Sequence, residues 1–80
     1  MEYLDIDDDD RVDLIHTFSG DPTKVLHLKI RHTNITQIPE EILRFENIRT
    51  LKISFNKITV LPDFIGEFKN LEELYIFDLI

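Results

Sequence analysis

The chain has 80 residues, of which 16 are acidic and 9 are basic, and it contains no cysteine. This length allows one small domain, and the lack of cysteine excludes disulfide bonds and thiolate metal sites. The formal net charge of −7 argues against a nucleic-acid-binding protein, because phosphate binding requires clustered lysine and arginine.

The acidity is concentrated at the N-terminus, where residues 1–23 hold eight acidic residues and only one basic residue, Arg11. The first ten residues have neither the basic region nor the apolar region of a secretory signal. No apolar run is long enough to span a bilayer. We therefore expect a cytoplasmic protein.

Residues 1–24 are predicted to form an acidic N-terminal cap with a short strand and a helix at about 11–18. The alternation of polar and apolar residues within 1–6 favours the strand. Asp10 suits the N-cap of the helix, with Asp13 reaching back to it as in a capping box, and Gly20 is expected to end the helix. Such a cap would cover the exposed first repeat of a solenoid.

The aspartates at 5, 7 and 9 alternate as in a calcium-binding EF-hand loop. Asp10 stands where that loop requires glycine, however, and His16 stands where it requires a bidentate glutamate. The sequence therefore favours a solvated cap and helix start over a calcium site, with an acidic docking segment for a basic partner as a further alternative. We expect no metal and no cofactor.

The rest of the chain repeats with a period of about 23 residues. Residues 28–48 read LxIxxTxIxxIPxxIxxFxNI and residues 51–71 read LxIxxNxIxxLPxxIxxFxNL, so that apolar residues, a proline and an asparagine recur in one register. Leu74 and Ile76 begin a third unit. A period in this range with L-x-x-L-x-L spacing indicates stacked repeats, here at 25–47, 48–70 and, in part, 71–80.

These motifs resemble the leucine-rich repeat class of about 23 residues that carries a Leu-Pro-x-x-Ile segment. The resemblance implies an α/β fold, a short solenoid with a parallel concave sheet and with short helical or 3₁₀ turns on its convex side. It also implies a scaffold or adaptor rather than an enzyme, and no catalytic constellation is present in the sequence. A structural N-terminal cap of a longer repeat protein is the alternative.

Strand residues that alternate with the inward leucines and isoleucines are expected to face outward on the concave sheet. We expect this face to change from basic to aromatic and acidic along the repeats and to bind a protein partner, because tyrosine, phenylalanine and arginine are enriched in interface cores. Burial of the aromatic residues in the core is the alternative. The expected contact residues are His27, Lys29, Arg31, His32, Lys52, Ser54, Phe55, Glu73, Tyr75, Phe77 and Asp78, and Thr50 is expected to face outward with them.

The last stretch, Leu71 to Ile80, is expected to form an edge strand without a polar cap. Exposed apolar edges promote pairing with other chains. Three arrangements would cover this edge: further repeats, a two-fold dimer through this strand, or a capping partner.

Overall fold

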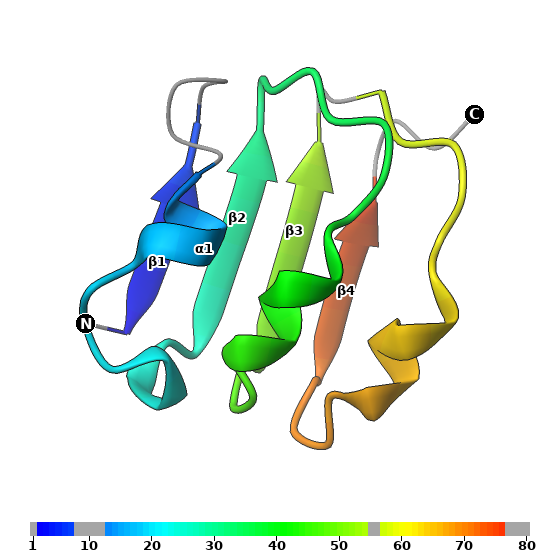
Figure 1. Cartoon of the computed structure of the whole chain (residues 1–80). Coiled ribbons are helices and arrows are strands. Elements are labelled where there is room, and N and C mark those ends of the chain that lie inside the picture. The colour runs from blue at the N-terminus through cyan, green and yellow to red at the C-terminus, as the bar shows by residue number, and fades with distance from the viewer. Residues whose placement is uncertain (1, 8–12, 55–56, 77–80) are drawn as a thin grey trace.

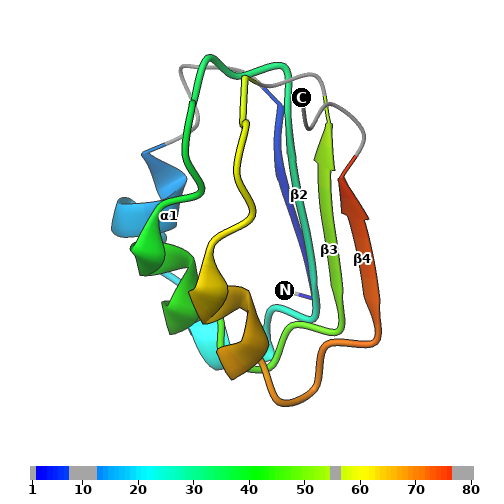
Figure 2. The same cartoon turned by 90° about the vertical axis from the view of Figure 1, so that its right-hand side faces the viewer.

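The computed structural model describes residues 2–7, 13–54 and 57–76 and contains one four-stranded parallel sheet. The strands lie side by side in chain order (Figure 1), as β1 Tyr3–Ile6, β2 His27–Arg31, β3 Thr50–Ser54 and β4 Glu73–Ile76. Short helical segments connect them and lie together on one face of the sheet (Figure 2), as α1 Leu14–Thr17, η2 Pro22–Lys24, η3 Glu40–Arg44 and η4 Asp63–Glu67. The protein is therefore an α/β domain of two layers.

The pairing of β2, β3 and β4 follows the repeat period of the sequence. Leu28 pairs with Leu51, and Leu51 pairs with Leu74, so these inward positions form one row across the sheet. Parallel strands require a crossover connection, and the turns η3 and η4 supply it on the same face each time. The three strands expected in the repeats are confirmed.

Strand β1 is the outer strand of the same sheet, and its offset from β2 is one residue longer than the repeat period. Leu4 pairs with Leu28, and Ile6 pairs with Ile30. The short N-terminal strand is confirmed, but the repeat period applied without change would have aligned Asp5 with Leu28. At the longer offset Leu4 and Ile6 enter the core, and Asp5 faces the opposite side of the sheet.

The helical turns of the repeats begin directly after prolines, as expected. Pro39 and Pro62 are the N-cap residues of η3 and η4. The N-terminal helix differs from the prediction of 11–18, since α1 ends at Thr17. Phe18 leaves the helical conformation at φ −52° and ψ 118°, so the helix ends before Gly20.

The start of α1 also differs from the expected capping box. Asp13 occupies the N-cap position itself and makes no side-chain capping hydrogen bond, while Asp10 lies outside the described residues. A side-chain cap is instead present at η2, where Asp21 accepts hydrogen bonds from the hydroxyl and the backbone N–H of Thr23. The hydrogen bond from the Thr23 hydroxyl has the larger effect and the one from its backbone N–H the smaller, and together they lower the pKa of the Asp21 carboxyl below its ordinary value of 3.8.

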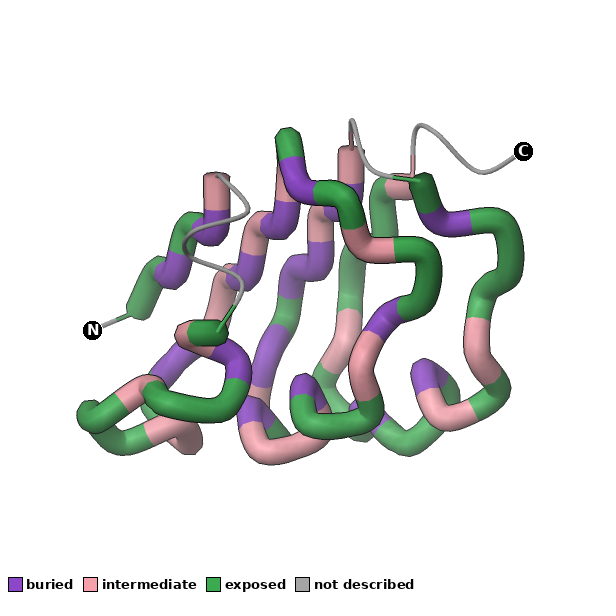
Figure 3. The backbone as a smooth tube through the Cα atoms, turned by 45° about the horizontal axis from the view of Figure 1, so that its top comes forward, coloured by how far each residue is buried: buried purple, intermediate pink, exposed green. Residues whose placement is uncertain are grey.

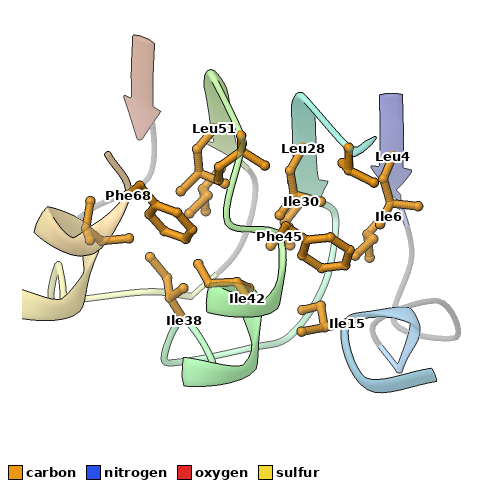
Figure 4. Packing of buried hydrophobic residues seen from close by; sticks show 14 of the residues in the cluster. Leu4, Ile6, Ile15, Leu28, Ile30, Ile38, Ile42, Phe45, Leu51 and Phe68 are labelled. Carbon is orange, nitrogen blue, oxygen red and sulfur yellow. The ribbon is translucent and has the colours of Figure 1, made fainter. Parts of the chain in front are cut away.

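The core lies between the sheet and the helical layer, with Phe45 near its centre (Figure 4). Phe45 is fully buried and packs edge-on against Phe18, with ring centroids 5.6 Å apart. Burial decreases toward β4 (Figure 3). Leu28 and Leu51 are fully buried, whereas Leu74 is 38% exposed in the corresponding inward position.

Polar side chains connect successive units away from the core. Asn47 donates from Nδ2 to the carbonyl of Thr23 at 2.9 Å, and Asn70 donates to Oδ1 of Asn47 at 3.3 Å. These bonds satisfy backbone and amide groups at the turns that precede the strands. The asparagine that closes each repeat in the sequence is therefore a link between units.

Candidate functional site

The sheet face opposite the helical layer carries no covering element among the described segments (Figure 2), and we call it the open face. Because the strands are parallel and in register, its side chains form rows that run across all four strands. The first row contains Tyr3, His27, Thr50 and Glu73, and the second contains Asp5, Lys29, Lys52 and Tyr75.

The first row is a continuous chain of contacts. The rings of Tyr3 and His27 are stacked, with centroids 4.5 Å apart and planes at 19°. Nδ1 of His27 lies 3.0 Å from the hydroxyl of Thr50, and that hydroxyl donates to the carboxylate of Glu73 at 3.4 Å. When the Thr50 hydroxyl donates to Glu73, it can accept a hydrogen bond from the Nδ1–H tautomer of His27, so polar contacts link three of the four strands in this row.

The second row places two lysines next to each other. Lys29 and Lys52 are paired residues of the neighbouring strands β2 and β3, and both are half-buried. The ammonium group of Lys52 lies 5.2 Å from the centre of the Tyr75 ring, a cation–π contact. Within residues 2–7, 13–54 and 57–76, no carboxylate forms an ion pair with either lysine.

At the carboxyl ends of the strands, basic residues contact aspartates from β1 and the residue after it. The guanidinium of Arg31 lies 3.3 Å from carboxylate oxygens of both Asp5 and Asp7. Nδ1 of His32 lies 2.7 Å from the carboxylate of Asp7, and the backbone of His32 has a φ of 57°. The open face therefore does not change simply from basic at β2 to acidic at β4, because Asp5 and Asp7 lie beside the basic residues of β2.

A shallow hollow of about 240 Å³ lies on the open face over these rows, and each strand contributes to its wall. Its lining residues are Tyr3, His27, Leu28, Lys29, Thr50, Lys52 and Glu73. A larger hollow of about 510 Å³ is lined by Arg49 and the turn at 69–72, and another of about 380 Å³ is lined by residues of the segments 36–38 and 59–64. Those two lie along connecting loops, so the open face is the better candidate because it combines aromatic rings with lysines that form no ion pair within the described ranges.

Most of the residues expected to contact a partner lie together on the open face. The structure places there His27, Lys29, Arg31, Lys52, Ser54, Glu73 and Tyr75, together with Thr50, which was expected only to face outward. His32 follows β2 and points to Asp7. The expected contacts Phe55, Phe77 and Asp78 lie outside the described residues.

Sequence reasoning missed the contribution of Tyr3, Asp5 and Asp7 to this face. A search at the fixed repeat period could not align them with β2, since the observed offset is one residue longer. The alternation of Leu4 and Ile6 was the available signal, because the longer shift matches both with the inward residues of β2.

The described part of the chain contains no group of three or more histidine, cysteine, aspartate or glutamate residues that could hold a metal ion. Asp5 and Asp7, which alternate in the calcium-like pattern, are bonded to basic side chains of β2 and the residue after it. No helix in the same ranges is long and apolar enough to cross a membrane.

Comparison of the chain with protein-family models, with curated proteins and with solved structures gives no match. A functional conclusion for this protein therefore depends on its own sequence pattern and on the geometry of its sheet.

Proposed function

We propose that the protein is a leucine-rich repeat module that binds another protein through its open face, as a scaffold or adaptor without catalytic activity. The repeated sequence pattern and the parallel sheet with turns after Pro39 and Pro62 support the repeat assignment. The observation that carries the binding proposal is the set of aromatic and charged rows around one hollow on a sheet face that no described element covers.

The side chains around the hollow have the chemistry of a protein interface. Tyr3 is 65% exposed and Tyr75 is 37% exposed, and they lie on the two edge strands of the open face, β1 and β4. Tyrosine offers a large rigid surface with a polar end, and it is frequent among the residues that dominate binding energy. The backbone of the face is held in a regular sheet, so binding would require little ordering of the protein.

The test compares capture of partner proteins by the wild-type chain with capture by Tyr3→Ala and Tyr75→Ala. We expect each variant to bind the captured partner at least about tenfold more weakly, because loss of an interface tyrosine commonly costs that much. The proteins would be quantified by mass spectrometry after capture, and the affinity for the purified partner would be measured by calorimetry.

Val60→Ala is the matched control for these variants. Val60 is 68% exposed and lies on a connecting loop rather than on the open face, so this variant is expected to bind as the wild type does. Equal binding by all three variants would place the interaction elsewhere and would remove the open face as the binding surface.

A structural role is the second candidate, and the exposure of leucines toward the C-terminal end of the described chain favours it. Leu74 and Leu61 are 38% and 39% exposed, although the equivalent Leu51 and Ile38 are buried. In this role β4 pairs with a further strand, either of an additional repeat or of a second copy of the chain.

Light scattering across a concentration series separates these arrangements. Self-pairing through β4 is expected to give twice the monomer mass of 9.5 kDa at high concentration, and Leu74→Lys is expected to return the chain to a monomer. A wild-type chain that stays monomeric at all concentrations would contradict self-pairing.

A further inference from the structure

We propose that the protein partner places an acidic side chain between Lys29 and Lys52, so that one aspartate or glutamate carboxylate accepts hydrogen bonds from both ammonium groups. This inference rests on the proposed function and adds the chemical class of the group that the open face recognises. It starts from the charge arrangement of the second row across the sheet.

The lysine pair is unfavourable for the free protein. Neighbouring strands lie roughly 4.8 Å apart, and like charges directly opposite each other on two strands destabilise a sheet. Lys29 and Lys52 are paired in register on the same face, and no ion pair to either is found within 2–7, 13–54 and 57–76. A carboxylate between them would replace this repulsion with two charge-assisted hydrogen bonds.

The neighbouring carboxylates are already engaged by other groups. Asp5 lies beside Lys29 in the same row but is bonded to Arg31 at 3.3 Å. Glu73 accepts the hydrogen bond from Thr50 at 3.4 Å. The positive charge of the face is therefore concentrated at the two lysines, which both line the hollow.

The surroundings of the pair favour a peptide carboxylate over a polyanion. Asp5 and Glu73 flank the two lysines on the outer strands, and the whole chain carries a net charge of −7. A nucleic acid would place further phosphates against these carboxylates, and it requires more clustered basic residues than two. A single acidic residue with uncharged or aromatic neighbours fits, because the rings of Tyr3 and Tyr75 lie on either side.

The experiment titrates the isotope-labelled full chain with three blocked peptide libraries that differ at one fixed central residue: glutamate, glutamine or lysine. Binding is followed by NMR through the backbone amides of β2 and β3 and through the side-chain methylene signals next to each lysine ammonium. The glutamate library is expected to bind about tenfold more tightly than its glutamine counterpart, and its affinity is expected to fall with added salt.

Lys29→Gln and Lys52→Gln are expected to remove this preference for glutamate. Lys24→Gln is the matched control, since Lys24 is exposed in η2 and its replacement changes the net charge equally. Loss of preference in the first two variants together with full preference in the control supports the proposal. Lys29→Gln is also expected to keep or raise the melting temperature, by about 1–3 °C, because it relieves the repulsion; lost binding is then not due to unfolding.

Two other outcomes would overturn the inference, and they differ in what they mean for the proposed function. If the glutamine or lysine library shifts the sheet amides as strongly as the glutamate library does, the open face binds peptides without recognising a carboxylate, and the proposed function stands. If no library shifts the signals of the open face, the binding role of this face is overturned as well.

Discussion

Replacement of Phe45 with alanine is expected to lower the free energy of unfolding by about 3–5 kcal/mol, the usual cost of truncating a buried phenylalanine. Phe45 is fully buried, and its ring packs against Phe18 at the centre of the core. A domain of this size has a total stability of roughly 4–12 kcal/mol, so the variant is expected to lose a large part of it. Urea unfolding followed by circular dichroism measures the change.

Phe68→Ala is the matched control, since Phe68 occupies the equivalent position one repeat later. Phe68 is 6% exposed and lies in the last described turn of the helical layer, next to the less covered β4. We expect a smaller loss there, because fewer atoms surround the cavity that remains. Equal losses for the two variants would contradict a core centred on Phe45.

Replacement of Arg44 with alanine is expected to lower the free energy of unfolding by about 2–3 kcal/mol. The Arg44 guanidinium donates from Nη1 to the carbonyls of Ile15 and His16, at 3.0 and 2.6 Å, and from Nη2 to that of Phe18 at 3.1 Å. These carbonyls lie in α1 and at its C-terminal end, so the side chain of η3 holds the N-terminal segment against the core. Loss of the guanidinium leaves polar groups at this contact without their donor.

Arg44→Lys is expected to recover only part of this loss, because one ammonium group cannot reproduce the planar fork that reaches three carbonyls. Arg49→Ala controls for the removal of a positive charge, since Arg49 is exposed and precedes β3. Chemical denaturation of the three variants gives the comparison. A loss from Arg49→Ala as large as that from Arg44→Ala would mean that net charge, and not the carbonyl contacts, sets the stability.

The sequence predicted the sheet well where side-chain spacing alone determines the structure. The inward residues Leu28 and Ile30 recur as Leu51 and Ile53 one repeat later, and this regular spacing places β2 and β3 in register. The prolines before η3 and η4 likewise predicted the positions of the helical turns. Strand alternation and proline geometry are local properties, so they can be read without knowledge of the fold.

The open face was predicted less completely, because its electrostatics depend on a strand with an irregular offset. The basic residues Arg31 and His32 could be assigned to the face from β2 alone. Their bonds to Asp5 and Asp7 depend on the longer offset of β1, which the repeat period does not contain. The conformation of His32, with its positive φ, also has no sequence signal comparable to a glycine.

The order of the strands has a consequence for how this domain opens. Each strand pairs only with its neighbours in the sequence, and burial is lowest in the last unit. Amide hydrogens of β4 should therefore exchange with solvent faster than those of β2 and β3, since opening of β4 breaks only one strand pairing among the described strands. Such partial opening would move Glu73 and Tyr75 away from the hollow while Lys29 and Lys52 stay in place. The β4 side of the hollow would therefore be open for part of the time in which its β2 and β3 side remains formed.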